Sequence, residues 1–407
     1  MERFVIERLG HQGDGIAAGP VFAPLTLPGE VVEARREGDR LRDLRVLTPS
    51  PDRVAPPCRH FRACGGCQLQ HARDGFVAQW KLDVVRQALA AQGLEARLPP
   101  ILTSPPQSRI RLGLAARRTK KAAMAGLHGR ASDTIVEIPD CRLIHPDLRA
   151  APALAARLAE VGASRKAALS VSVTQGVNGL DIAVTGGKPL DAPLRLALAQ
   201  IAEQGDVARL TWEDEQIAMR RPPVQQMGRA RVIPPPGAFL QATREGAADL
   251  VDQVRAILGT CARVADLFAG CGTFALPLAE TAEVHAVEGE TMMLRALDRA
   301  WRDTPGLKRI TTEPRDLFRR PLMPDELRRF DAVVLDPPRA GAAAQVAMLA
   351  QTRVPVIAYV SCIPTSFARD ARVLADAGWR LDFVQVVDQF RWSTHTELVA
   401  RFALPHM

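Results

Sequence analysis

With 407 residues, the chain is too long for one ordinary hydrophobic core, and we expect two or three domains that each bury a core of their own. No run approaches the roughly 18 to 20 apolar residues that span a bilayer, and the start "MERFVIERLG" lacks the apolar run of a signal peptide, so we expect a cytoplasmic protein with no membrane segment. Arginine dominates a net charge of +8, which suits a phosphate-rich partner, although genomic base composition also produces arginine-rich chains.

Residues 1–50 carry the pattern of a small all-β barrel. Short alternating stretches such as "FVIERL", "GEVVEARR" and "RLRDLRVL" are separated by glycine-containing turns. Barrels of this size commonly present a basic, curved face to RNA, and Arg35, Arg36, Arg40 and Arg45 supply charge for one. A plain accessory barrel fits the same pattern.

A proline-flanked linker, residues 48–57, leads into the cysteine-rich motif "CRHFRACGGCQLQH". Cys58, Cys64 and Cys67 stand six and three positions apart in a chain that has only seven cysteines. Disulfides rarely persist in a reducing cytosol, so a close cluster indicates a metal site, an iron–sulfur site or a catalytic thiol. The spacing alone leaves the fourth ligand open.

Residues 58–230 are expected to form a mixed α/β domain. An amphipathic helix is predicted over residues 75–93, and the two alternating halves of residues 167–186 flank a "GVNG" turn, which predicts a hairpin. The "PPP" at 234–236 closes this region.

Residues 231–407 alternate buried apolar strands with helices, the signature of a doubly wound parallel sheet in an α/β domain. "RVADLFAGCGTFALPLAE" reads as strand, glycine turn and helix, and "EVHAVEGE" is the next strand, which ends in an acid. Glycines let a cofactor approach the backbone, and such an acid can accept both ribose hydroxyls of a nucleoside. The isolated GxG lacks the full GxGxxG of a nucleotide dehydrogenase.

A third strand, in "FDAVVLDPPRAG", delivers Asp336, Pro337 and Pro338 to the same sheet edge. Together with the GxG turn and Glu288, this element makes the domain similar to class I S-adenosylmethionine-dependent methyltransferases, whose Rossmann-like fold we therefore expect. In that superfamily an Asp-Pro-Pro element is typical of enzymes that methylate nucleobases or amides.

Two further residues indicate covalent catalysis. Cys362 ends the strand in "VPVIAYVSC" just before a helix, where a thiolate is stabilised and can attack, although a lone cysteine is more commonly a buried structural residue. Glu397, just before the last apolar strand, can act as a general base.

A nucleophile, a base and a methyl donor imply methylation of a pyrimidine, since carbon 5 of uracil is not nucleophilic until a group adds to carbon 6. In this hypothesis Cys362 adds to carbon 6, the enolate takes the methyl group, Glu397 removes the carbon-5 proton, and elimination frees Cys362. The target base must leave its stack to reach the pocket.

Over nearly its whole length the chain resembles the RNA (uracil-5-)-methyltransferase family, and within it the iron–sulfur branch that acts on 23S ribosomal RNA. The N-terminal barrel is similar to a TRAM domain, an OB-type RNA-binding module, and residues 58–71 resemble the "CxxFxxCGGCxxQH" motif of that branch. The resemblance implies Cys141 as the fourth ligand of a [4Fe-4S] cluster, with zinc as the alternative metal. It also implies 23S ribosomal RNA as the partner, and we expect a monomer.

The same resemblance implies the residues of the active site, with S-adenosyl-L-methionine as the cofactor. Cys362 matches the nucleophile and Glu397 the base. The cofactor-binding residues that it implies are Gln241, Phe268, Thr273, Glu288, Asp316 and Asp336.

The chain departs from the family pattern at three positions. Ile363 and Thr273 each stand where the family has asparagine, and Arg391 stands where it has proline. Two alternatives to a 23S enzyme therefore stay open: a transfer RNA uridine methyltransferase, and a catalytically weakened RNA-binding iron–sulfur protein on the same scaffold.

Overall fold

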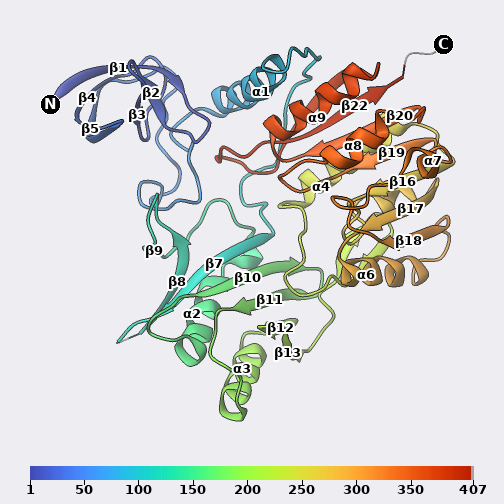
Figure 1. Ribbon diagram of the computed structural model, residues 1–407. Coiled ribbons are helices and arrows are strands. Elements are labelled where there is room, and N and C mark those ends of the chain that lie inside the picture. Colours follow the sequence, from blue (N-terminus) through green and yellow to red (C-terminus); the bar gives the residue numbers. More distant parts are fainter. Residues whose placement is uncertain (121, 405–407) are drawn as a thin grey trace.

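The computed structural model describes residues 1–120 and 122–404, and Figure 1 shows a small barrel, a central sheet and a larger C-terminal sheet covered by helices. The last three positions of the predicted 231–407 domain lie outside the described residues. Within the described part of the chain, no helix is both long and apolar enough to cross a bilayer.

Five strands close into a barrel at the N-terminus, which confirms the predicted OB-type barrel. In order around the barrel the strands are β1 (Glu2–Leu9), β2 (Gly15–Ala17), β3 (Val21–Ala23), β5 (Arg40–Thr48) and β4 (Val31–Glu37). Inward-facing side chains such as Ile6, Val21 and Leu41 are almost fully buried. Gly15 leaves no room for a side chain, because a Cβ there would lie 2.1 Å from the hydroxyl oxygen of Thr26.

The central sheet has seven strands, with helices α2 and α3 packed on it. The strands in spatial order are β13 (Glu215–Met219), β12 (Arg209–Trp212), β11 (Gly179–Thr185), β10 (Leu169–Gly176), β7 (Arg111–Arg118), β8 (Ala123–His128) and β9 (Ile135–Val136). The helices are the short 3₁₀ turn Pro146–Leu148, α2 (Ala151–Gly162) and α3 (Ala192–Gln204). The predicted hairpin is present, since β10 and β11 pair antiparallel with Gly176 opposite Gly179.

The C-terminal sheet is doubly wound, as predicted, with five neighbouring parallel strands and one antiparallel strand inserted beside them. In spatial order the strands are β18 (Ile310–Pro314), β17 (Glu283–Glu288), β16 (Arg263–Leu267), β19 (Ala332–Leu335), β20 (Val356–Ser361), β22 (Glu397–Ala403), β21 (Arg380–Asp388) and β6 (Leu102–Thr103). The helices are α4 (Arg244–Leu258), α5 (Ala275–Leu278), α6 (Thr291–Arg302), α7 (Pro324–Leu327), α8 (Ala343–Leu349) and α9 (Pro364–Asp376). A two-stranded ribbon, β14 (Gln225–Met227) with β15 (Ala230–Val232), precedes α4.

Helix α1 (Asp74–Ala90) joins the barrel to the C-terminal sheet. Its first half buries Val77 against Leu9 of the barrel, and its second half buries Val85 and Leu89 in the core of the C-terminal domain. Figure 1 shows α1 beside α9, and β6 adds a parallel edge strand next to β21. These elements come from the 58–230 segment but lie with the C-terminal sheet, because an amphipathic pattern shows which face is buried and not what buries it.

A buried ion pair fixes α1 to the loop between β21 and β22. Lys81 has no exposed side-chain surface, and its ammonium nitrogen lies 2.6 Å from a carboxylate oxygen of Asp388. It also donates to the carbonyl oxygens of His395, at 2.8 Å, and Phe390, at 3.2 Å. Three donors thus meet three acceptors, which satisfies a charge that would otherwise be costly to bury.

We expect Lys81→Met to lower the free energy of unfolding by about 3 to 5 kcal/mol, because it leaves the Asp388 carboxylate buried without a cation. Urea unfolding followed by tryptophan fluorescence measures the change. Arg86→Met on the same helix is the control, since the exposed Arg86–Asp83 pair contributes about 1 kcal/mol or less. Equal losses in the two variants would contradict the assigned role of Lys81.

Candidate active site

A cavity of about 550 Å³ opens at the carboxyl edge of the C-terminal sheet, where ligands of doubly wound folds bind. Turns and loops that follow β16, β17, β18, β19 and β20 contribute to it, together with the first residue of β22. Seven of the eight predicted catalytic and cofactor-binding residues line this one cavity: Phe268, Thr273, Glu288, Asp316, Asp336, Cys362 and Glu397.

The turn after β16 brings backbone to the cavity wall. Phe268 has a left-handed φ of 65°, and Gly272 has a φ of 96° with Leu276 and Leu297 about 3 Å from where a Cβ would stand, so glycine is needed there. Glu288, at the end of β17, accepts from the amide of Gly270 at 3.0 Å and from its own following turn. These bonds hold the carboxylate at the cavity in one orientation.

Strand direction explains why Cys362 and Glu397 meet. Cys362 directly follows β20, a parallel strand that ends at the carboxyl edge. Because β22 runs antiparallel to β20, its first residue, Glu397, lies at that same edge. The register pairs Ser361 with Leu398, so the two residues flank the pair on the cavity side.

Carboxyl groups dominate the polar lining of the cavity, and burial disfavours the charged forms of two of them. Burial and then Asp336 raise the pKa of Glu397 to about 8, and burial and then Glu288 raise the pKa of Asp336 to about 7. Burial, followed by Glu397 and Asp336, raises the pKa of Cys362 to about 11, and Arg339 only partly offsets this. The expected stabilisation of the Cys362 thiolate is therefore not met in the protein alone, because burial disfavours the charged thiolate and the nearby carboxyl groups add to this effect. A bound cation would oppose both effects.

Gln241, the eighth predicted residue, lines an adjoining cavity of about 360 Å³, which shares Thr273 with the first cavity. It reaches the active site through Gln389, a residue that the sequence did not single out. The Gln389 amide nitrogen donates to Gln241 at 2.6 Å and to the Glu397 carboxylate at 3.1 Å. No local pattern marks Gln389, because its partners Gln241 and Ala242 come from a distant part of the chain.

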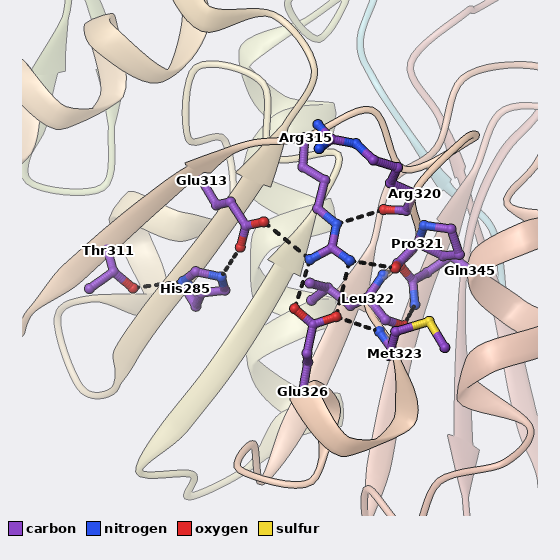
Figure 2. A network of polar contacts seen from close by, with 10 residues as sticks. All are labelled: His285, Thr311, Glu313, Arg315, Arg320, Pro321, Leu322, Met323, Glu326 and Gln345. Atoms are coloured by element: carbon purple, nitrogen blue, oxygen red, sulfur yellow. Dashed lines mark hydrogen bonds and ion pairs between the residues drawn. The ribbon is translucent and has the colours of Figure 1, made fainter.

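Arg315 is a second residue that sequence reasoning missed. Figure 2 shows its guanidinium between Glu313 and Glu326, with further donation to the carbonyl oxygens of Arg320 and Pro321. These contacts fold the segment after β18 back on itself. The next residues along that segment, 316–318, form one wall of the larger cavity.

The four predicted ligand cysteines lie outside the larger cavity, three of them in one hydrophobic cluster and Cys64 in a neighbouring core that Cys141 also contacts. Cys58, Cys67 and Cys141 pack around Phe61, Leu143 and Trp392. Burial raises the pKa of the Cys67 thiol to about 12, and Cys141, Cys64 and Cys58 add to this rise. The other three sulfurs are thus close enough to Cys67 to interact with it electrostatically. Among the described residues, however, no group of three or more His, Cys, Asp or Glu side chains is arranged to hold a metal ion, and all seven cysteines are free thiols.

Comparison with known proteins agrees with this geometry. Residues 309–401 match the model of the tRNA (uracil-5-)-methyltransferase family. A Caulobacter vibrioides protein described as an RNA methyltransferase is 45% identical, over 99% of this chain and 100% of its own length. The Nitrosococcus oceani 23S rRNA (uracil(1939)-C(5))-methyltransferase RlmD is 34% identical, over 98% of this chain and 95% of its own length.

The fold has a solved counterpart. The Pyrococcus abyssi tRNA (uracil-54, C5)-methyltransferase, crystallised with S-adenosyl-L-homocysteine, superposes with a TM-score of 0.77 at 23% identity, over 98% of this chain and 99% of that one. The architecture is thus that of a class I S-adenosylmethionine-dependent methyltransferase with an N-terminal barrel. The sequence identity to these relatives covers almost the whole chain, and the fold agrees with it. The chain is therefore an enzyme of the RNA (uracil-5-)-methyltransferase family.

Proposed function

We propose that the protein methylates carbon 5 of a uridine in 23S ribosomal RNA, with S-adenosyl-L-methionine as donor and a covalent Cys362 adduct as the intermediate. The observation that carries the proposal is that Cys362 and Glu397 flank one cavity at the sheet edge, beside Asp336. The 34% identity to a 23S enzyme over almost the entire chain supports the choice of RNA.

The cavity suits this cofactor. Glu288, held by two backbone amides, is placed to accept the ribose hydroxyls, and Asp316 with Phe268 borders the side where a nucleoside base would lie. When bound, S-adenosylmethionine supplies an electrophilic methyl group and a positive sulfonium. A bound cation would favour the charged forms of Asp336 and Glu397, and a positive charge beside Cys362 lowers the pKa of its thiol.

In the proposed mechanism Cys362 loses its proton to solvent and its sulfur forms a bond to carbon 6 of the uracil, which moves an electron pair to carbon 5. Carbon 5 then takes the methyl group as its bond to the sulfonium sulfur breaks, and S-adenosyl-L-homocysteine is the leaving group. Glu397 accepts the proton from carbon 5, the carbon 5–carbon 6 double bond returns, and the bond to the Cys362 sulfur breaks. Asp336 and the two prolines that follow border the position of the planar base.

We propose that the RNA passes an exposed aromatic residue at the cavity. Phe239 is 63% exposed at the rim of the larger cavity, and the Arg111 guanidinium lies over its ring, 5.1 Å from the centroid. Such a platform stacks an unpaired base well. We further propose that residues 1–50 act as a TRAM-type module, since all four arginines singled out there are exposed.

The four clustered cysteines are proposed to hold a [4Fe-4S] cluster with a structural role. Four thiols are the donor set of a Cys₄ site, and three of them lie in one small hydrophobic cluster. To hold the iron–sulfur cluster, the side chains would have to turn from the arrangement that the described residues show. Analysis of protein purified without air should give iron and sulfide in equal amounts and a broad visible absorption. One zinc per colourless chain would instead support the alternative metal.

Incubation with labelled S-adenosylmethionine and unmodified 23S RNA tests the proposed function, with transfer RNA transcripts as the second arm. We expect label on carbon 5 of one or more uridines of the 23S RNA alone. Label on the transfer RNA only would favour the transfer RNA alternative. Binding of 23S RNA without any label would favour the catalytically weakened protein.

Arg315→Ala is expected to weaken S-adenosylmethionine binding about tenfold, equivalent to about 1.4 kcal/mol, because the segment that carries Asp316 loses its central anchor. Calorimetric titration measures the affinity. Arg299→Ala is the control, since Arg299 is an exposed residue on α6. Unchanged affinity in Arg315→Ala would show that the cavity wall does not depend on this network.

A further inference from the structure

We infer that Gln389 is a positioning residue, which holds the Glu397 carboxyl group and the Gln241 side chain in one fixed arrangement for proton removal. The inference rests on the proposed function, because it assigns Glu397 the role of base. It concerns a residue that touches neither the cysteine nucleophile nor the larger cavity.

The hydrogen bonds of Gln389 leave its amide a single orientation. Its side-chain oxygen accepts from the backbone amide of Ala242 at 2.8 Å, and a backbone N–H can only donate. The amide nitrogen must therefore be the group that faces Gln241 and Glu397, to which it donates at 2.6 Å and 3.1 Å. Both amide hydrogens and the oxygen are used, in a side chain only 2% exposed.

The backbone of Gln389 is clamped on both sides. Lys81 bonds the residue before it, Asp388, and the residue after it, Phe390. The N-terminal turn of α4 packs directly on the side chain: a Cβ at Gly246 would lie 2.6 Å from that of Gln389. A glycine at the start of α4 and a buried lysine on α1 thus hold Gln389 between them.

The contact has a chemical consequence for Glu397. A hydrogen bond donated to a carboxylate favours its charged form, which is the form that a base needs. The charged or titratable groups around Glu397 are Asp336 after β19 and Cys362 after β20, with Arg339 beside Cys362. Burial and Asp336 raise the pKa of Glu397, and the Gln389 donor opposes them.

The test compares Gln389→Leu with wild type in single-turnover methylation of 23S RNA between pH 6 and pH 10. We expect a rate at pH 7 lower by roughly tenfold or more, part of the 10² to 10⁴ that a general base contributes. In Gln389→Leu the methylation rate should rise with a midpoint at higher pH than in wild type. At high pH the rate of the variant should approach that of wild type. Gln389→Met, unbranched and of similar length, serves if the leucine variant does not fold.

Gln385→Leu is the matched control. Gln385 is a buried amide on β21, the strand that ends one residue before Gln389, and is 5% exposed. Among the described residues its nitrogen donates only to the carbonyl oxygens of Pro100 and Val386. A purely structural role would give both variants the same loss with an unmoved pH profile, and that result would overturn the inference. If wild type transfers no methyl group, the proposed function fails instead, so the two failures are told apart.

Discussion

Methyl transfer is expected to stop in Cys362→Ala, with a rate at least about 10³-fold below that of wild type. Without the sulfur nothing adds to carbon 6, and carbon 5 of uracil stays too weak a nucleophile to take the methyl group. The variant should still bind S-adenosylmethionine, because Glu288 and Asp316 remain in place. Filter-bound label from methylated RNA measures the rate, and calorimetry measures the binding.

Cys261→Ala controls for the loss of a thiol. Cys261 is partly buried, donates to the carbonyl oxygen of Leu258 at 3.0 Å and lies outside the larger cavity. Its variant should keep nearly full activity. Activity that persists in Cys362→Ala would reject the covalent mechanism, while methylation as such would still stand.

Glu397→Gln is expected to stall the reaction at a later step, the removal of the carbon-5 proton. The amide keeps the size of the carboxyl group but cannot take the carbon-5 proton, so turnover should fall by about 10² to 10⁴. Addition of Cys362 and methyl transfer come before that step. A methylated RNA–protein adduct should therefore accumulate, and it is detected as a labelled band that survives a denaturing gel.

The wild-type enzyme should show the matching pH dependence. Glu397 acts in its ionised form, and burial with Asp336 raises its pKa to about 8. Turnover should therefore rise as pH increases through about 8. In Glu397→Gln, the residual rate of proton removal should show no rise at this pH. Glu280→Gln, at an ion pair with Arg255 outside the larger cavity, should keep the wild-type profile. A Glu397→Gln variant that turns over at the wild-type rate would remove Glu397 from the mechanism.

The three residues that depart from the family pattern each have a defined place in the fold. Arg391, in place of proline, forms an ion pair with Asp74 at the start of α1, so the loop before Glu397 gains a second anchor beside Lys81. Ile363 occupies the position before α9, where its backbone amide donates to the Ser361 hydroxyl at 3.2 Å. Thr273 lines both cavities.

The sequence by itself determined the sheet architecture and most of the cavity. Strands that alternate with helices require a parallel sheet, and the ends of parallel strands share one edge. For that reason a glycine turn, Glu288, Asp336 and Cys362, each read as the end of a strand, were placed together correctly. The alternating pattern of the N-terminal segment was likewise enough to predict the barrel.

Only the tertiary structure decided which distant side chains support that cavity and how they set its charge. Lys81, Arg315 and Gln389 carry no local pattern, because their hydrogen bonds to Asp388, Glu326 and Gln241 depend on how the chain folds and packs and not on the order of the elements. The raised pKa of Cys362 could not be predicted from the sequence either. A pKa depends on burial and on the sum of nearby charges, and both exist only once the chain has folded.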